Sequence, residues 1–181
     1  KLIEPFVGAG SVFLNTQYPK YLLNDINPDL INLYQIIQSK GDSYAQDAIS
    51  MFTPSNNQES HYYAIRQEFN LSKDPYERSV LFLYLNRHGY NGLCRYNGKG
   101  KFNVPFGRYK APYFPEKELD IFAEKSKSRT LETFTSSIVN HINIDDIRSV
   151  LNLYKTEEET QSLADFIEKE GNGGWQKEKV S

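Results

Sequence analysis

The sequence predicts a mixed α/β fold, in which the opening of a doubly wound parallel sheet is followed by helices and a β-hairpin. Two short apolar segments near the start are each followed by a polar turn and then by a helical pattern, which is typical of such a sheet. Amphipathic segments follow, and a glycine-rich turn divides a basic stretch at about 86–113. With 39% hydrophobic and 24% charged residues, the 181-residue chain has a globular composition and is long enough for one core with an inserted subdomain.

Residues 1–40 form the predicted start of the sheet. Lys1-Leu2-Ile3 is the end of a first strand, and Ser11 is the expected N-cap of a short helix. Residues 21–24 form a second strand that ends at Asp25. A helix begins at Asn27-Pro28-Asp29, because proline is favoured at the first helical position. Its expected buried stripe consists of Leu30, Ile31, Leu33, Tyr34, Ile36 and Ile37.

Residues 41–125 are predicted to form a helical subdomain. Its helices are expected at 44–52, at 60–70, from about 74 to the basic stretch, and at 116–125. The apolar side of the last of these helices would consist of Leu119, Ile121, Phe122 and Ala123. The signals weaken from residue 126, although 145–154 and 157–170 retain a helical period. We therefore treat 126–181 as a diverged C-terminal segment of uncertain origin.

The stretch at 86–113 is the most informative part of the chain for function. It holds six Lys/Arg residues and no acid, although the net charge of the whole chain is -2. Cations neutralise the phosphates of nucleic acids, and the interleaved aromatic side chains can stack on unpaired bases. Asn97-Gly98 and Lys99-Gly100 indicate the turn of a hairpin, in which Pro105 limits the second arm to an edge position. A protruding basic hairpin favours nucleic acid as the partner, while a solvated hairpin without a partner remains the alternative.

The composition of the chain excludes several kinds of site and several classes of protein. The lone Cys94 excludes an intramolecular disulfide and a multi-cysteine zinc site, and the scattered histidines lack ligand spacing, so we predict no metal. No apolar run approaches the roughly twenty residues that span a bilayer, and residues 1–5 do not resemble a signal peptide. We therefore expect a cytoplasmic protein without a membrane partner. Nine acids against five bases at 145–181 predict that this part stays away from a polyanion.

The turn Gly8-Ala9-Gly10 is a candidate cofactor site. It follows the first strand and opens a helix, so its backbone N–H groups can approach a ligand at the positive end of the helix dipole. Asp25 ends the next strand, where an acid can accept hydrogen bonds from a ribose diol. The Glu4-Pro5-Phe6 prefix differs from the dinucleotide fingerprint and suits an adenosine with a sulfonium side chain, which Phe6 would line. A short glycine turn of this kind is also common for purely structural reasons.

Two groups of residues together resemble the Dam-type DNA adenine-N6 methyltransferases. The first is EPFVGAGSVFLN at 4–15 with NDINPDLI at 24–31, and the second comprises FLYLNR at 82–87, GYNGLCRYN at 89–97 and FNVPFGRYK at 102–110. The resemblance implies a partial Rossmann-like class I methyltransferase sheet with an inserted helical DNA-recognition subdomain that carries the hairpin. It also implies methyl transfer from S-adenosylmethionine to adenine N6 within GATC, after the base is flipped from the duplex.

The resemblance implies roles for individual residues as well. Asp25 would hold the ribose of S-adenosylmethionine, and the other cofactor residues would be Glu4, Pro5, Phe6, Gly8, Gly10, Ser11 and Ile26. The residues that would contact or wedge the partner, duplex DNA, are Arg66, Tyr90, Asn91, Leu93, Arg95, Asn97, Asn103, Pro105, Arg108 and Tyr109.

Two motifs of that family do not occur in this sequence. The chain starts inside the first strand, so the family's N-terminal Lys-Trp-X-Gly-Gly-Lys segment is missing, and no Asp-Pro-Pro-Tyr occurs, so we assign no catalytic residue. In the family, the Asp and a prolyl carbonyl of that motif accept hydrogen bonds from the adenine amino group, and the Tyr stacks on the flipped base. Two hypotheses follow: an enzyme whose missing segment comes from another part of the gene or from a partner polypeptide, and a DNA-binding remnant without catalysis. The basic stretch disfavours a small-molecule methyltransferase.

Overall fold

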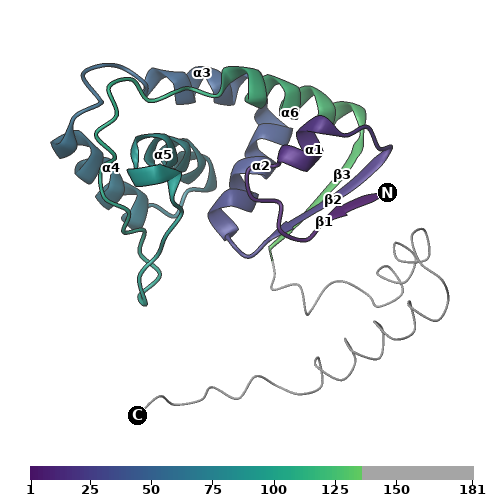
Figure 1. Ribbon diagram of the computed structural model, residues 1–181, viewed down its shortest axis with the longest axis horizontal. Helices are drawn as coiled ribbons and strands as arrows, with labels where there is room; N and C mark the ends of the chain where they lie inside the picture. The colour runs from purple at the N-terminus through teal and green to yellow at the C-terminus, as the bar shows by residue number, and fades with distance from the viewer. Residues whose placement is uncertain (136–181) are drawn as a thin grey trace, which may run out of the picture. The chain divides into compact units, whose positions relative to one another are not determined.

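The computed structural model of the protein describes residues 1–135, which form one unit (Figure 1). Within this part of the chain, three strands and six α-helices follow one another in the order β1, α1, β2, α2 to α6, β3. The parallel sheet confirms the mixed α/β class and is consistent with part of a doubly wound sheet. The helices predicted at 145–154 and 157–170 lie outside the described residues.

The sheet has the order β1-β2-β3, and its strands are Leu2–Glu4, Lys20–Asp25 and Thr130–Thr135. Both neighbouring pairs are parallel: Ile3 pairs with Leu22, which in turn pairs with Glu132. Because the strands are parallel, their carboxyl ends meet at one edge, which is where ligands bind in open α/β sheets. The turn after β1 and Asp25 at the end of β2 are therefore brought to the same edge.

Three helices accompany the sheet, namely α1 (Ser11–Asn15), α2 (Pro28–Lys40) and α6 (Glu116–Ser128). Helix α2 packs against β2 and β3, and α6 packs against β3 and α1. An aromatic group fills the space between them: Phe13 meets the Tyr21 ring edge-on at 4.8 Å, and Phe122 stacks on Tyr34 at 4.7 Å between ring centroids. Helix α2 begins at Pro28, as predicted, with the Asn27 side chain as its cap.

Lys125 is buried against α1, although the apolar pattern of α6 predicts no charged residue there. Its ammonium group donates hydrogen bonds to the backbone carbonyls of Phe13, Leu14 and Thr16 at the end of α1. Carbonyls at a helix C-terminus lack partners within the helix and favour a cation, so these bonds offset the cost of burying the charge. Ile121, which the pattern places in the core, is instead 37% exposed.

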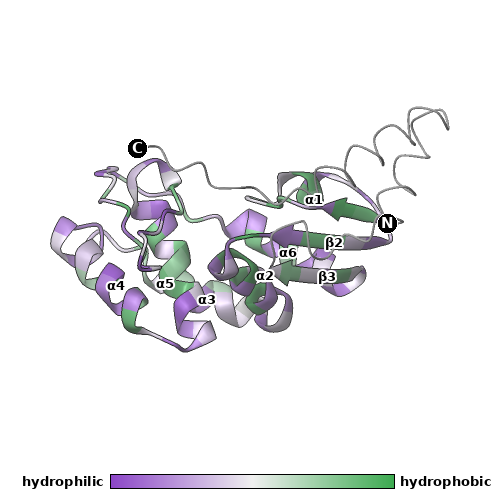
Figure 2. Cartoon of the chain, turned by 90° about the horizontal axis from the view of Figure 1, so that it is seen from below, coloured by the Kyte–Doolittle hydropathy of each residue, from purple (hydrophilic) through white to green (hydrophobic). Residues whose placement is uncertain are grey.

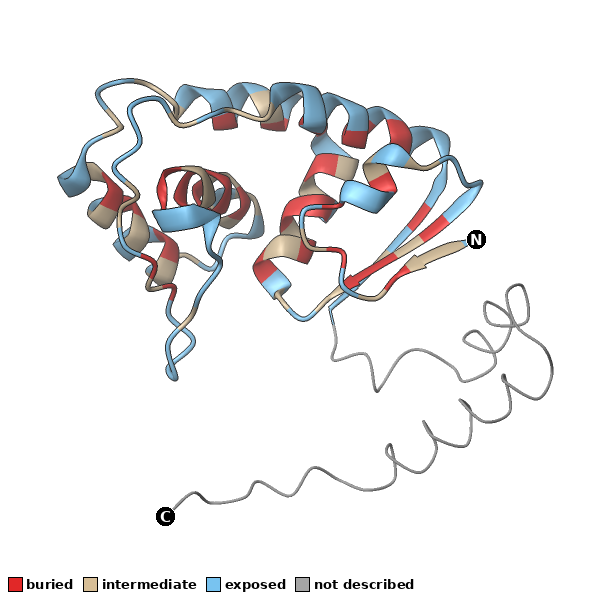
Figure 3. Cartoon of the chain, in the orientation of Figure 1, coloured by how far each residue is buried: buried red, intermediate tan, exposed pale blue. Residues whose placement is uncertain are grey.

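Helix α5 (Pro75–His88) is the centre of the helical part and packs against α2, α3 (Asp42–Ser50) and α4 (Glu59–Leu71). All side chains from Leu81 to Leu85 are buried (Figure 3). A helix that is apolar all round has to be covered all round, and the surrounding helices do this. Figure 2 shows the same hydrophobic character along α5 and along β2. Helices α3, α4 and α5 lie where the sequence predicts them.

Two local predictions are wrong. Ser11 is not an N-cap, because Gly10 takes that position with a φ of 70° and no side chain caps the helix. Strand β3 was not predicted. Its sequence, TLETFT, is mostly polar, and only one of its side chains, that of Leu131, is buried. The strand is instead held by pairing with β2 along its whole length. Residues 126–135, which the sequence groups with the C-terminal segment, therefore belong to the described unit.

We call residues 89–113, which connect α5 to α6, the basic loop. The predicted hairpin is not found as two paired strands, because the loop has single antiparallel bridges, from Gly89 to Phe106 and from Tyr96 to Phe102. The Asn97 N–H donates to the Lys101 carbonyl at 2.9 Å and so closes the tip. The tip projects away from α4 and α5 in Figure 1. The loop thus follows the course of a hairpin without forming a ladder.

Side chains of α4 explain why the ladder is missing. Asn70 accepts a hydrogen bond from the Phe102 N–H at 2.8 Å and donates one to the Phe102 carbonyl at 3.0 Å. Tyr62 and Arg66 both donate to the Val104 carbonyl, at 3.0 and 2.9 Å. The backbone groups of Phe102 and the Val104 carbonyl are therefore satisfied by α4, and only isolated backbone bonds, such as that from the Asn103 N–H to the Arg95 carbonyl, join the two arms.

Two glycines form the neck of the basic loop. A Cβ atom on Gly89 would lie 2.5 Å from the Leu85 carbonyl oxygen, and one on Gly107 would lie 2.8 Å from the Gly89 carbonyl oxygen. Both distances are too short for a side chain. The Gly107 N–H also donates to the His88 carbonyl at 2.8 Å. At these two positions the backbone of the loop therefore packs too closely against neighbouring backbone for any residue larger than glycine.

His88, at the end of α5, is buried and stacks on the Tyr84 ring at 3.9 Å between ring centroids. Burial lowers the pKa of His88 to about 4; the hydrogen bond to the Tyr84 carbonyl opposes this shift, and His61 and Arg87 add to it. The imidazole is therefore uncharged in the folded protein at neutral pH.

This histidine should make the protein less stable in mild acid. Its pKa is about 6.5 in the unfolded chain, so its full contribution is present above that value and is lost as the pH falls towards 4. Between pH 7.5 and 5, the free energy of unfolding should fall by about 2 kcal/mol through this group. Urea unfolding at both pH values measures the change, and His88→Phe, which keeps a ring on Tyr84, should remove it. An equal pH difference in both proteins would contradict the assignment.

Candidate cofactor and DNA-binding site

The glycine turn after β1 is fastened to the end of β2. The Gly8 N–H donates to Asp25 Oδ2 at 3.0 Å, and the Asn27 N–H donates to Asp25 Oδ1 at 2.9 Å. The Tyr34 hydroxyl, from α2, donates to the Gly8 carbonyl. Each carboxylate oxygen has a further lone pair, so Asp25 is held in one orientation while it retains acceptor capacity for a ligand.

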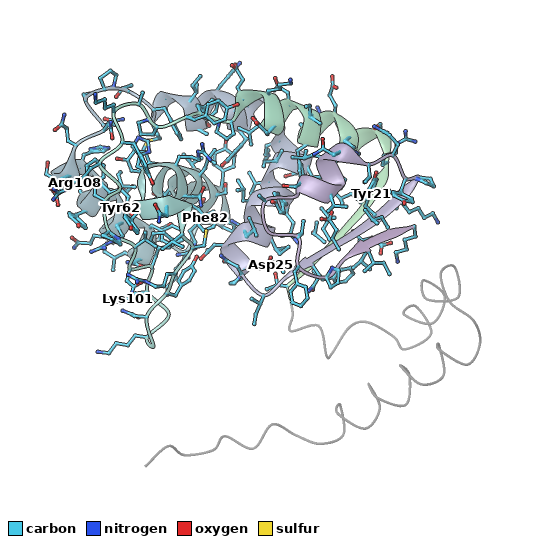
Figure 4. The ribbon with its side chains drawn as sticks, viewed as in Figure 1. Tyr21, Asp25, Tyr62, Phe82, Lys101 and Arg108 are labelled. Carbon is cyan, nitrogen blue, oxygen red and sulfur yellow. The ribbon has the colours of Figure 1, made fainter. Side chains whose placement is uncertain are left out.

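A cavity of about 670 Å³ lies beside this turn. Its polar lining comes from Asp25, Asn27, Asn86, Arg87 and Glu118, and its apolar lining includes Leu30, Leu33, Phe82, Leu83 and Phe122. Two of these residues, Asp25 on β2 and Phe82 on α5, are labelled in Figure 4 and come from different elements. Cavities of this size, mostly apolar with a few convergent polar groups, hold small ligands. A nucleoside fits this lining, because Asp25 can accept hydrogen bonds from ribose hydroxyls and the apolar side chains can cover a flat base.

Three of the eight predicted cofactor residues, Gly8, Asp25 and Ile26, line this cavity. The other five, which do not line it, are Glu4, Pro5, Phe6, Gly10 and Ser11. Phe6 is 77% exposed, whereas Glu4 is buried beneath the turn, where burial raises its pKa. Its Oε2 atom has no hydrogen-bond partner within the described residues. The cavity is thus built on the glycine turn and Asp25 rather than on the Glu-Pro-Phe prefix.

The basic loop carries nine of the ten residues predicted to contact DNA, and Arg66 lies on α4. Eight of the ten are exposed, namely Tyr90, Asn91, Leu93, Arg95, Asn97, Pro105, Arg108 and Tyr109, while Arg66 and Asn103 are partly buried. Tyr90 is 51% and Leu93 is 42% exposed, although both are large apolar groups. Exposed groups of this kind on a loop rich in cations are typical of an interaction surface.

Arg95 and Asn103 bind each other across the loop. Arg95 Nε donates to Asn103 Oδ1 at 2.8 Å, and Arg95 Nη2 donates to the Asn103 carbonyl at 3.2 Å. The Asn103 N–H in turn donates to the Arg95 carbonyl at 3.0 Å. These bonds orient the guanidinium group and leave its other N–H groups for a ligand.

The side chains of Asn97 and Tyr109 hold the backbone of the basic loop at two places, its tip and Asn91. The Asn97 Oδ1 atom accepts hydrogen bonds from the N–H groups of Lys99 and Lys101, at 2.9 and 3.1 Å, and thereby shapes the tip. The Tyr109 hydroxyl accepts a hydrogen bond from the Asn91 N–H at 2.9 Å. Asn91 has a φ of 53°, a conformation that asparagine tolerates better than most residues.

Arg66 and Arg108 differ in how firmly they are held. Arg66 bonds to the second arm as described, and its guanidinium lies over the Tyr63 ring at 4.6 Å. Arg108 faces Glu59 at 3.4 Å, but its side chain is 76% exposed, so this ion pair contributes little to stability. Arg66 therefore supports the loop, and Arg108 is available to an outside partner.

Sequence reasoning missed three residues where α5 meets the basic loop. Asn86, Arg87 and Tyr113 line both the large cavity and a second cavity of about 370 Å³. Asn86 Nδ2 donates to the Gly92 carbonyl at 2.6 Å, and Arg87 Nε donates to the Tyr113 carbonyl at 2.9 Å. The available signal was a polar pair in the last turn of α5, directly after five consecutive buried residues.

Within residues 1–135, no group of three or more His, Cys, Asp or Glu side chains could hold a metal ion. None of the helices in this described part has the length and apolar character to cross a membrane. Cys94 lines the large cavity and is exposed, and partial desolvation by the surrounding protein raises the pKa of its thiol.

Comparison with known families and proteins gives one consistent result. Residues 1–170 match the family described as D12 class N6 adenine-specific DNA methyltransferase. The match includes the whole described unit and most of the segment at 126–181.

Curated relatives named DNA adenine methylase match at high identity. The protein from Serratia marcescens is 63% identical over 129 residues, which are 71% of this chain and 48% of that protein. The protein from Escherichia coli strain K12 is 63% identical over 127 residues, with shares of 70% and 46%. The protein from Vibrio cholerae O395 is 58% identical over 130 residues, with shares of 72% and 47%. The chain thus spans about half the length of the curated relatives it matches.

Proposed function

The chain belongs to the D12 class of N6 adenine-specific DNA methyltransferases, and on this premise we propose that it acts in methyl transfer from S-adenosylmethionine to adenine N6 in duplex DNA, at GATC. The names of the relatives support DNA adenine as the substrate. Because the chain spans about half of their length, the activity of the whole protein is a proposal for this chain.

The exposed basic loop is the main observation that supports the proposal. From Arg78 to Pro115 the sequence has seven Lys/Arg residues and no acid. Helix α4 and the glycine neck hold the loop in place, and its tip is exposed (Figure 3). A fixed projection with cations, amides and exposed aromatic side chains suits a DNA groove, whereas a merely solvated loop needs no such support.

Asp25 and the glycine turn are the proposed cofactor holders. When bound, S-adenosylmethionine supplies an electrophilic methyl group on a sulfonium. The Asp25 carboxylate would accept hydrogen bonds from the ribose hydroxyls, and Ile26 would cover the adenine ring. The Gly8 N–H keeps Asp25 in place at 3.0 Å, so the acceptor is oriented before the ligand arrives.

The residues of the basic loop divide into two proposed roles. Arg95, oriented by Asn103, would read a base edge, and Tyr90 and Leu93 would wedge into the duplex when the target base leaves the stack. Lys99 and Lys101 at the tip would contact phosphates, which hold the protein on DNA without reading sequence.

Catalysis needs groups that residues 1–181 do not supply. No Asp-Pro-Pro occurs in the sequence, and Asp145-Asp146 lacks both the rigid prolines and an aromatic neighbour for the base. We therefore propose that this chain provides the cofactor turn and the DNA reader, and that the catalytic motif comes from a further segment or a second polypeptide.

The first prediction concerns methyl transfer by the chain alone. Incubation with labelled S-adenosylmethionine and a GATC duplex should give no incorporation above background, because the groups that position the adenine amino group are missing. An Escherichia coli relative serves as the positive control. Incorporation that persists in the purified chain would show that the missing motif is not required.

A second prediction concerns Asp25. Asp25→Ala should weaken S-adenosylmethionine binding by about 10- to 100-fold in calorimetry, because charge-assisted hydrogen bonds to the ribose are lost. Asp47→Ala is the matched control, since Asp47 also accepts a hydrogen bond, from the Tyr76 hydroxyl at 2.7 Å, but lies away from the cavity. Unchanged affinity in Asp25→Ala would mean that the cofactor binds elsewhere.

A third prediction tests the proposed function by separating base readout from phosphate binding. Arg95→Ala should cost about 1–3 kcal/mol on a GATC duplex and little on a scrambled duplex. Lys99→Ala and Lys101→Ala should weaken both duplexes alike and lower the salt slope by about one unit per charge. Fluorescence anisotropy at two salt concentrations measures these effects. Equal losses on both duplexes for Arg95→Ala would contradict the readout role.

A further inference from the structure

Asp29, in the first turn of α2, joins three parts of the described unit. The residue is 7% exposed, and its side chain bonds to α5 and to the basic loop. The Asp29 Oδ1 atom accepts hydrogen bonds from Arg78 Nε at 3.0 Å and from Arg78 Nη2 at 2.7 Å. The other oxygen, Oδ2, accepts one from the Tyr96 hydroxyl at 2.6 Å.

The backbone of Asp29 is connected to the cofactor turn. Its N–H donates to Asn27 Oδ1 at 3.0 Å, and the Asn27 N–H donates to Asp25 Oδ1 at 2.9 Å. Asp25 Oδ2 then accepts from the Gly8 N–H. One short segment, residues 25–29, therefore presents Asp25 to the cavity and Asp29 to the basic loop.

Arg78 makes the Asp29 end of this chain rigid. Its Nη1 donates to the carbonyls of Phe69 and Ser72, at 2.8 and 2.9 Å. Its guanidinium also lies over the Phe69 ring at 4.2 Å. The carboxylate of Asp29 is therefore fixed by α5 and α4, and the Tyr96 hydroxyl has a fixed acceptor.

Tyr96 carries this constraint into the basic loop. It forms the antiparallel bridge with Phe102 and packs edge-on against the Phe102 ring at 5.5 Å between centroids. Its neighbour Arg95 is the residue assigned above to base readout. A shift of residues 25–29 therefore moves Tyr96, and with it the start of the reading surface.

We propose that Asp29 and Tyr96 are positioning residues that couple cofactor binding at Asp25 to DNA reading by the basic loop. The inference rests on the proposed function for its two ligands, but the coupled path exists in the free protein. A cofactor bound to Asp25 adds a further restraint to residues 25–29, and the Tyr96 hydroxyl transmits this restraint to the loop. Such coupling is reciprocal, so DNA bound at the loop raises cofactor affinity by the same factor.

The test compares Tyr96→Phe with Tyr76→Phe. Each substitution removes one tyrosine hydroxyl bonded to an aspartate, Asp29 at 2.6 Å or Asp47 at 2.7 Å, and each keeps the ring. Only Tyr96 contacts the segment 25–29. The two variants therefore match in chemistry and differ in location.

The first measurement is hydrogen exchange in the free protein, which requires neither ligand to bind. Tyr96→Phe should speed exchange by about threefold to tenfold both in the basic loop and at the Gly8 and Asn27 amides, which depend on Asp25. Tyr76→Phe should leave both regions unchanged. Faster exchange confined to the loop, or in neither region, would overturn the proposal.

The second measurement is the ratio of cofactor Kd values without and with a GATC duplex. We expect a ratio of about fivefold or more in the unchanged chain and in Tyr76→Phe, and a ratio near one in Tyr96→Phe. A ratio that Tyr96→Phe leaves intact would overturn the coupling role. If the basic loop does not read DNA sequence, the Arg95→Ala comparison will show it. The exchange measurement requires no DNA, so it would still test the coupling between the loop and the cofactor turn.

Discussion

The burial of the middle of α5 on every side is the constraint on which the described unit depends. Residues Leu81 to Leu85 have no polar side to turn to water, so helices have to cover them all round. Helix α2, which belongs to the sheet, supplies one cover, and α3 and α4 supply others. The sheet with the proposed cofactor turn and the helices that hold the basic loop are therefore packed on one helix. Its start carries Arg78, and its end carries Asn86 and Arg87 at the cavity.

The basic loop takes its shape from the helices rather than from its own strand pairing. Apart from buried residues such as Phe102 and Val104, most of the loop is exposed, and it would lose conformational entropy on becoming ordered. Asn70, Tyr62 and Arg66 on α4 compensate for this by satisfying backbone groups of the second arm. The resulting projection is ordered before DNA arrives, which lowers the ordering cost of binding.

Local chemistry in the sequence predicts the helices and part of the site. Pro28 and Pro75 mark the starts of α2 and α5, and the parallel-sheet rule brings Gly8 and Asp25 together. Strand β3 escaped prediction because pairing with β2, and not its own side chains, holds it in place. The buried Lys125 depends on carbonyls more than a hundred residues away, which no local pattern reports.

Within the candidate site, too, local features could be predicted from the sequence and long-range contacts could not. The acid-free stretch marks the proposed DNA-binding surface, because composition and charge describe exposed residues well. The partners of those residues are long-range: Asn70 for Phe102, Glu59 for Arg108 and Asp29 for Tyr96. The roles of Asn86 and Arg87 likewise follow from where α5 ends in space, which the sequence leaves open.

The way the loop is attached has a consequence for how its specificity can evolve. The neck at Gly89 and Gly107, and the bonds from Asn70, Tyr62 and Arg66, engage main-chain atoms of the loop. Main-chain atoms are the same whatever the side chain, so exposed positions whose side chains do not themselves hold the loop, such as Lys99 and Lys101, can change without weakening the attachment. If the loop reads DNA as proposed, the scaffold would hold an exchangeable reading module, in which the bases recognised can vary while the position of the loop is retained.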